Sequence, residues 1–168
     1  MNLFRKILWT VGVLSLFFGS CKKEEEPVDT ILEAQKNKEW GESFLQEKKS
    51  QAGVYEDPSG LLYEIFIQGT GAKPGAKDTV VITYNGYFID NRQFVTMTEK
   101  KAMEDMMEGF HIGLRHMNEG STYRLYIPYY LAYGTRSLKA VYDKKEYKIK
   151  EYSALIYDIT LDSIIFVE

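Results

Sequence analysis

The stretch GFHIGLRHMNEGSTYRLYIPYYLAYG, residues 109–134, joins a helical pattern directly to a strand pattern. Phe110, Leu114 and Met117 follow one another at i, i+4 and i+7, which predicts a short amphipathic helix. Residues 121–127 then alternate between two faces, as in a strand with one buried side. This stretch therefore predicts a sheet packed against one helix, and its five tyrosines need an explanation.

Strand patterns also lie on both sides of this stretch. Residues 61–67, 79–89 and 153–167 are rich in β-branched and aromatic side chains and predict three further strands. In the last of them an apolar face that includes Tyr157 alternates with a more polar face. One dry and one wet face are typical of an antiparallel sheet covered on a single side. The predicted fold class is α+β, a curved antiparallel β-sheet wrapped around one short α-helix.

A further helix is expected ahead of the sheet. Thr30 and Glu33 have the spacing of a capping box and predict a helix over about residues 31–50. Its apolar stripe is thin, because Trp40 and Phe44 pair at i, i+4 and little else repeats. We expect this helix to dock lightly on the domain or to serve as a spacer, and it is the candidate surface for a homodimer.

The first twenty residues are typical of an export signal. Arg5 and Lys6 precede an apolar run at 7–18, which is too short to cross about 30 Å of hydrocarbon at about 1.5 Å per residue. Small residues then precede Cys21, the sole cysteine, in a layout that resembles the lipobox of bacterial lipoproteins. The resemblance implies that 1–20 is a lipoprotein signal peptide and that Cys21 carries the lipid.

Three segments of the chain resemble, in order, the FKBP-type peptidyl-prolyl cis-trans isomerases: 59–94, 109–134 and 153–164. In this family the strands wrap around a helix, and an apolar pocket between them holds a proline. The resemblance implies an isomerase without cofactor or metal that acts on exported, proline-containing polypeptides. It implies catalytic roles for Tyr133, Phe110 and Tyr84, and substrate-binding roles for Phe94, Val95, Met106, Met107 and Tyr157.

The chemistry implied by this resemblance needs no nucleophile. Rotation about an X-Pro amide bond has a barrier of about 18–20 kcal/mol, because resonance is lost in the twisted state. A dry pocket disfavours the polar planar amide relative to the less polar twisted one. The hydroxyl of Tyr133 resembles the one that donates a hydrogen bond to a substrate carbonyl in the family.

The chain departs from the family pattern in several places. Val95 stands where an aspartate commonly lines the pocket, and Phe110 where the floor is often a tryptophan. Only fifteen residues separate Phe94 from Phe110, where relatives usually have an extra strand. Residues 135–152 replace a Gly-rich loop and predict a hairpin overhanging the site, which either alters substrate choice or is a solvated decoration.

The domain boundaries and location follow from these patterns. We expect a flexible tether at 21–29, an N-terminal helical segment at 30–54 and an FKBP-like domain at 55–168. A lipidated chain would be held on a membrane, and the expected location is the outer membrane, facing the periplasm or the cell surface. The alternative function is a catalytically weak or inactive binding, scaffold or chaperone lipoprotein.

Other sites are disfavoured by the sequence. The formal net charge is −3 with both signs interspersed, so nucleic acid is not an expected partner. His111 and His116 are five residues apart and do not share a helical face as zinc ligands would. Residues 69–75, GTGAKPG, lack the Gly-Lys-Ser/Thr ending of a phosphate loop. Without the family resemblance, the aromatic set would be read as ordinary core.

Overall fold

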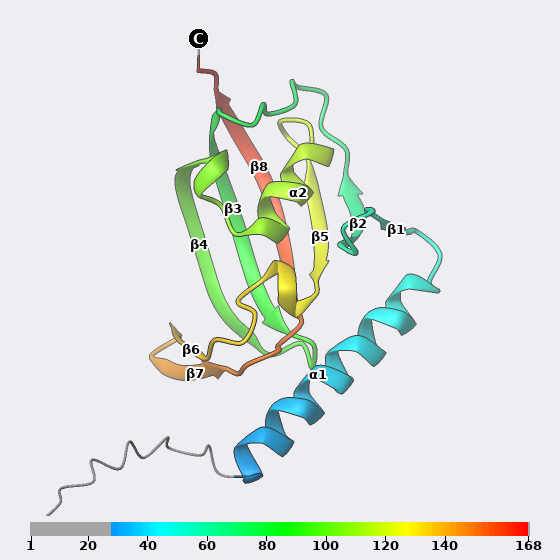
Figure 1. Cartoon of the computed structure of the whole chain (residues 1–168). Helices are drawn as coiled ribbons and strands as arrows, with labels where there is room; N and C mark the ends of the chain where they lie inside the picture. The colour runs from blue at the N-terminus through cyan, green and yellow to red at the C-terminus, as the bar shows by residue number, and fades with distance from the viewer. Residues whose placement is uncertain (1–27, 168) are drawn as a thin grey trace, which may run out of the picture.

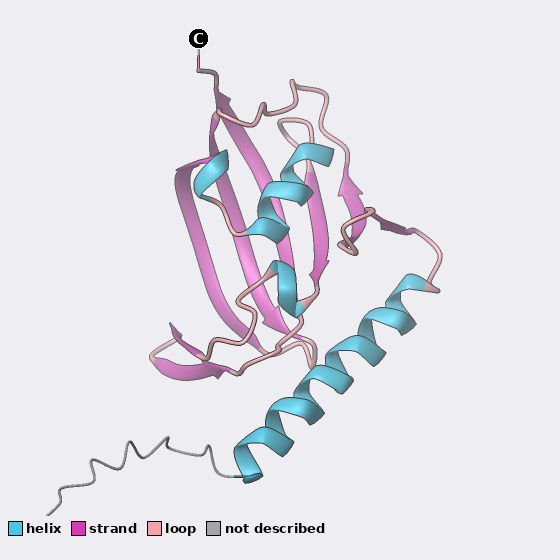
Figure 2. Cartoon of the chain, viewed as in Figure 1, coloured by secondary structure: helices cyan, strands magenta, loops and turns pink. Residues whose placement is uncertain are grey.

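The computed structural model describes residues 28–167, whose centre is a six-stranded antiparallel sheet (Figure 1). Its spatial order is β1-β2-β5-β8-β3-β4. This sheet and the helices around it confirm the predicted α+β class (Figure 2). The expected signal peptide at 1–20, the lipid site Cys21 and the tether as far as residue 27 lie outside the described residues. The strands are β1 (Val54–Glu56), β2 (Leu62–Ile67), β3 (Thr79–Phe88), β4 (Gln93–Ala102), β5 (Thr122–Ile127) and β8 (Leu155–Ile165).

The two strands at the middle of the sheet carry its core. β5 and β8 pair in an antiparallel register that sets Leu125 opposite Tyr157 and Ile127 opposite Leu155. All four of these side chains are buried, because residues two apart in a strand point to the same face. The alternation predicted for both strands is confirmed except at Tyr126 and Ile156, which are buried on the opposite face.

The helix α2 (Glu108–His116) lies across the inward face of the sheet (Figure 1). Leu114 is fully buried and Phe110 is 4% exposed, as the predicted apolar stripe requires. A Cβ atom on Gly113 would lie 2.5 Å from the side chain of Leu125 on β5. Only glycine permits this approach, so the helix packs closely against the sheet at this point.

Strand β4 was not predicted from the sequence, and neither was the short strand β1. β4 pairs with β3 along nearly its whole length and leads directly into a 3-10 turn, η1 (Met103–Asp105). The fifteen residues between Phe94 and Phe110 therefore do contain a strand. This strand, β4, already begins at Gln93, ahead of Phe94. Part of it therefore lies outside the interval, which is why the interval looks too short to hold a strand.

The helix α1 (Val28–Lys49) packs on the outer face of the sheet. It begins two residues before Thr30, so Thr30 and Glu33 lie inside it and the predicted capping box does not mark its start. The ring of Phe44 lies 5.9 Å from that of Tyr126 on β5. α1 thus docks on the domain, which was one of the two expectations for this helix.

The outer face of the sheet is therefore not wet throughout. Leu62, Tyr126 and Ile156 are only 2–3% exposed, because Phe44 and Leu45 of α1 cover them. The expectation that the sheet is covered on a single side is wrong at this end. Elsewhere on the outer face polar side chains pair with one another, as in the two hydrogen bonds from the Arg124 guanidinium to Asp158.

A separate two-stranded sheet follows β5 and a second 3-10 turn, η2 (Tyr129–Leu131). It consists of β6 (Leu138–Tyr142) and β7 (Lys145–Ile149), which confirms the predicted hairpin. The two turn residues, Asp143 and Lys144, have φ values of 48° and 59°, the left-handed conformation that a two-residue hairpin turn requires.

Candidate active site

A pocket of about 330 Å³ opens between α2, the sheet and the β6–β7 hairpin. Side chains from eight separate parts of the chain meet around it: β3, β4, the turn before α2, α2 itself, the loop after β5, β6, β7 and β8. All the pocket residues expected from the sequence line it, namely Tyr84, Phe94, Val95, Met106, Met107, Phe110, Tyr133 and Tyr157.

Tyr157 of β8 is the centre of the aromatic cluster at the base of this pocket. Its ring centroid lies 4.8 Å from Phe110 and 5.8 Å from Phe94, with both rings nearly perpendicular to it. Tyr84 completes the set, 5.1 Å from Phe110 and 5.9 Å from Tyr157. Such edge-to-face pairs contribute about 0.5–1.5 kcal/mol each beyond area burial, so the rings hold one another in place.

A β-bulge brings two adjacent residues of β4 to the pocket. Gly86 of β3 pairs with Val95, whereas the next residue, Tyr87, pairs with Gln93. Phe94 is therefore the extra residue of the bulged strand, and its side chain is not forced to the opposite face from Val95. Both side chains line the pocket as a result.

Gly86 leaves the space that these aromatic side chains fill. A Cβ atom built on it would lie 2.6 Å from Tyr157, 2.6 Å from Val95 and 2.9 Å from Phe94. No side chain larger than hydrogen fits there without displacing a wall of the pocket. Gly86 was not among the site residues predicted from the sequence, although a glycine inside a strand pattern signals a close approach of this kind.

Three hydroxyl groups point toward the same region. The Tyr133 and Tyr157 hydroxyls lie 3.4 Å apart, and the Tyr84 hydroxyl donates to the sulfur of Met97 at 3.3 Å. Burial raises the pKa of Tyr157 well above its ordinary value, and the neighbouring Tyr133 raises it further. Burial and then the Glu99 carboxylate likewise raise the pKa of Tyr84. The Tyr84 and Tyr157 hydroxyls therefore keep their protons at neutral pH.

These shifts predict a loss of stability in alkaline solution. A raised pKa means that the folded protein favours the neutral tyrosine, so this stability is complete below about pH 10 and is lost as the pH rises toward the folded pKa. The urea midpoint should fall as the pH rises above about 10, and the midpoint of Tyr157→Phe should fall less steeply than that of the unmodified protein. Equal slopes for the two proteins would contradict the assignment.

Residues of β4 that the sequence analysis overlooked form the rim of the pocket. Met97, Glu99 and Lys101 follow Val95 at every second position and line the same pocket. This alternation in QFVTMTEKKA was the available signal, but it requires that β4 be recognised as a strand. The rim is thus partly charged, whereas the floor is aromatic.

The β6–β7 hairpin forms one wall of the pocket. Leu138 and Ala140 of β6 and Ile149 of β7 line the pocket, which confirms the predicted overhang. Tyr142 donates a hydrogen bond of 3.1 Å to Gln93, so the hairpin is tied to β4. Among residues 28–167 no cluster of three or more His, Cys, Asp or Glu side chains is arranged to hold a metal ion.

The chain is an antiparallel sheet with one helix across its inward face, and the concave aromatic pocket between them has a size and lining that suit a compact apolar group. Residues 70–162 match the family described as FKBP-type peptidyl-prolyl cis-trans isomerase, and residues 17–65 match the domain amino terminal to it. The first match covers more than half of the chain, so the chain belongs to the FKBP-type peptidyl-prolyl cis-trans isomerase family.

Two curated proteins illustrate the similarity. The outer membrane protein MIP of Legionella longbeachae is 41% identical over 111 residues, which are 62% of this chain and 47% of that protein. FKBP-type peptidyl-prolyl cis-trans isomerase FkpA of Escherichia coli is 32% identical over 148 residues, which are 85% of this chain and 49% of that protein. The chain spans about half the length of the curated relatives it matches.

Solved structures agree with this assignment. The crystal structure of FkpA from Escherichia coli superposes with a TM-score of 0.72 and 26% identity, covering 81% of this chain and 62% of that chain. A peptidyl-prolyl cis-trans isomerase from Pseudomonas syringae gives a TM-score of 0.69 and 26% identity, covering 78% of this chain and 95% of that chain. Both superpositions therefore include more of this chain than the sheet and α2 alone.

Proposed function

We propose that this protein is a peptidyl-prolyl cis-trans isomerase that acts on exported polypeptides. The observation that supports this most is the pocket itself, in which Tyr84, Phe110, Tyr133 and Tyr157 from four separate elements surround one hollow. A hollow of about 330 Å³ is at the lower end of the range of small-ligand pockets and suits a prolyl side chain with its flanking backbone.

In this proposal the proline ring packs on Phe110 and Tyr157, at the aromatic base of the pocket. The walls exclude water from the X-Pro amide, so the polar planar form loses solvation that the twisted form needs less. The Tyr133 hydroxyl, 3.4 Å from that of Tyr157, turns to donate a hydrogen bond to a substrate carbonyl. Tyr84 contributes a wall whose own hydroxyl already bonds to Met97.

The proposed location is the cell envelope, with Cys21 as the lipid attachment site. The order of basic residues, apolar run, small residues and cysteine supports this proposal, as does the name of the Legionella relative, outer membrane protein MIP. Within residues 28–167, no helix has the length and apolar character needed to cross a membrane. Attachment through an acyl chain at Cys21 is compatible with that finding.

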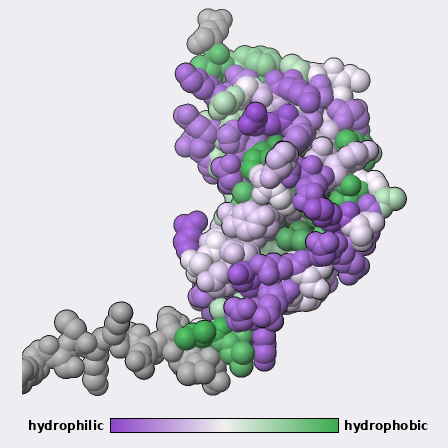
Figure 3. Space-filling view, turned by 45° about the vertical axis from the view of Figure 1, so that its right-hand side comes forward, coloured by the Kyte–Doolittle hydropathy of each residue, from purple (hydrophilic) through white to green (hydrophobic). Residues whose placement is uncertain are grey.

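A homodimer through α1 is part of the same proposal. Ile31 and Leu32 are 60% and 51% exposed near the start of α1, and Trp40 is 52% exposed further along it. The face shown in Figure 3 is mostly hydrophilic, with small separate hydrophobic patches. Exposed large apolar side chains along a helix offer contacts to a second copy of that helix.

A binding or scaffold protein on the same fold is the second candidate. Val95 favours it, because its aliphatic side chain lines the pocket where the family commonly has an aspartate. A chaperone that holds unfolded chains at the charged rim is a further form of this candidate. In both cases a proline peptide would bind without a gain in the rate of isomerisation.

The test of the proposed function is the cis-to-trans relaxation of a short X-Pro peptide. Tyr133→Phe should lower kcat/KM about tenfold, because one hydrogen bond is worth about 0.5–1.5 kcal/mol and about 1.4 kcal/mol changes a rate tenfold. Tyr130→Phe is the matched control, since Tyr130 is in the same loop but is 56% exposed and does not line this pocket. Peptide binding with no rate gain by the unmodified protein would favour the scaffold.

A further inference from the structure

Residues 150–153, in the segment that joins β7 to β8, lie between α1 and the loop that carries Tyr133. The backbone N–H of Tyr152 donates a hydrogen bond of 2.9 Å to the carbonyl of Gly134, the residue directly after Tyr133. The Tyr152 ring also lies 5.1 Å from that of Tyr129 in the same loop. The connecting segment 150–153 therefore supports the loop from behind.

On its other side, the connecting segment receives two hydrogen bonds from one side chain of α1, that of Asn37. The amide nitrogen of Asn37 donates to the backbone carbonyl of Glu151 and, at 3.1 Å, to the hydroxyl of Ser153. Asn37 is more than 110 residues away from both partners in the sequence. Its two bonds span Tyr152, so they fix the peptide that bonds to Gly134.

Asn37 belongs to a stripe of α1 that faces the connecting segment. Glu33, Asn37 and Gly41 are four residues apart and share one side of the helix. The carboxylate of Glu33 accepts a hydrogen bond from Lys150, and a Cβ atom on Gly41 would lie 3.1 Å from the side chain of Ala154. The stripe therefore meets the chain continuously from Lys150 to the start of β8.

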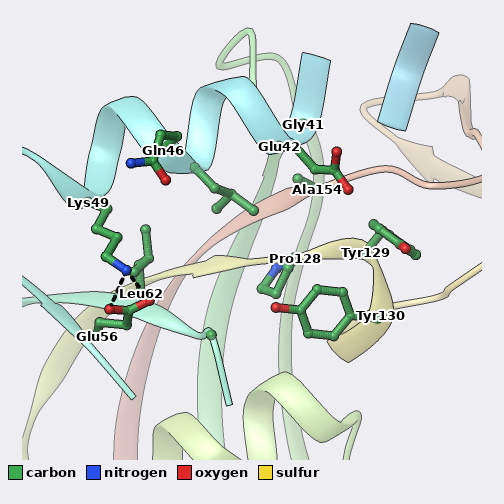
Figure 4. A pocket seen from close by; sticks show the side chains of 12 residues that line it. Gly41, Glu42, Gln46, Lys49, Glu56, Leu62, Pro128, Tyr129, Tyr130 and Ala154 are labelled. Carbon is green, nitrogen blue, oxygen red and sulfur yellow. Dashed lines mark hydrogen bonds and ion pairs between the residues drawn. The ribbon is translucent and has the colours of Figure 1, made fainter. Parts of the chain in front are cut away.

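Beyond this stripe, α1 contacts the sheet through Phe44 and Leu45 but leaves a gap beside the loop after β5. A groove of about 300 Å³ separates it from Leu62, Pro128 and the Tyr129–Tyr130 pair (Figure 4). The Lys49–Glu56 ion pair, at 2.7 Å, bridges the far end of this groove. The connection between α1 and the Tyr133 loop is thus narrow, and Asn37 supplies its central polar contacts.

We propose that Asn37 is a positioning residue for the isomerase pocket. It holds the connecting segment against Gly134 and thereby fixes the backbone that aims the Tyr133 hydroxyl. The effect on catalysis rests on the proposed function, whereas the effect on the position of Tyr133 does not. A displacement of about 1 Å is enough to weaken a catalytic hydrogen bond strongly.

The kinetic test combines Asn37→Ala with Tyr133→Phe. Asn37→Ala should lower kcat/KM about fivefold in the unmodified protein and should have almost no effect in the Tyr133→Phe background, because both changes then remove the same interaction. Gln35→Ala, at an exposed position of the same helix, is the control and should leave the rate unchanged. Equal losses in both backgrounds would overturn the proposal.

A second experiment reports on the surroundings of the Tyr133 ring and does not depend on isomerase activity. With 3-fluorotyrosine placed at position 133, the fluorine resonance should shift or broaden in Asn37→Ala, shift less in Ser153→Ala, and stay unchanged in Gln35→Ala. An unchanged resonance in folded Asn37→Ala would overturn the proposal even if the protein is an active isomerase. A shift in a protein without isomerase activity would support the positioning role and reject the proposed function instead.

Discussion

Replacing Phe110 with alanine should reduce kcat/KM for an X-Pro peptide about 100-fold, the largest kinetic effect expected from any single change. Phe110 contacts both Tyr84 and Tyr157, with ring centroids 5.1 and 4.8 Å away. Its removal leaves a cavity at the base of the pocket, so the proline loses its floor and water gains access to the amide. The same change should lower the free energy of unfolding by about 3–5 kcal/mol.

The loss of activity must be separated from the loss of stability. Leu114→Ala is the matched control, because Leu114 is fully buried on the same helix and does not line the pocket. It should cost about 2–5 kcal/mol of stability yet keep kcat/KM within about twofold of the unmodified protein under conditions where both are folded. Wild-type kcat/KM in folded Phe110→Ala would contradict the role of Phe110 as the floor.

Replacing Gly86 with alanine should also disable the pocket, by filling it rather than by emptying it. The added Cβ atom would lie 2.6 Å from both Tyr157 and Val95, so at least one wall must move. Overpacking of this kind costs about 1–3 kcal/mol of stability. We expect kcat/KM to fall at least about tenfold, measured in the same peptide assay, because Tyr157 is the ring on which the other aromatic side chains pack.

A second substitution tests this explanation directly. Val95→Ala removes one of the atoms that the new Cβ would meet, so the pair Gly86→Ala and Val95→Ala should regain part of the thermal stability lost in Gly86→Ala alone. Losses that simply add in the double variant would show that Val95 is not the obstacle. A Gly86→Ala protein with unchanged thermal midpoint and activity would contradict the close packing itself.

The central strands and α2 could be predicted because burial follows a simple period in them. Tyr123, Leu125 and Ile127 alternate with more polar residues, and Phe110 and Leu114 repeat at helical spacing. β4 was not predicted because its two faces differ little in polarity. Threonines lie on one face, and a mixed set of residues from Val95 to Lys101 lies on the other. A strand that borders a pocket on one face and water on the other carries little apolar signal.

The docking of α1 was underestimated for a related reason. Its contact stripe consists of Glu33, Asn37 and Gly41, none of which counts toward an apolar face. The partners of this stripe are backbone atoms and small side chains, which periodicity does not reveal. Hydrophobic patterning therefore described what α1 covers through Phe44, but not what fixes it.

The eight pocket residues came from the family resemblance, and the structure places all of them around one hollow. The resemblance did not identify residues that line the pocket only because of the pairing register between strands. Gly86 matters because the bulge at Phe94 sets it against Tyr157, and Glu99 lines the rim because β4 continues past the matched segment. Pairing between strands decides such neighbours, and pairing is a tertiary property.

The five tyrosines between residues 123 and 133 have different neighbours. Tyr123 stacks on Tyr63 in the interior, Tyr126 lies beneath α1, and Tyr133 enters the pocket. Their destinations depend on counting from a fixed origin in β5. A single inserted residue there would send the interior ring outward and the helix-facing ring inward. The length of this stretch is therefore constrained more tightly than its composition, and an evolving lineage could exchange its aromatic residues far more readily than lose or gain one position.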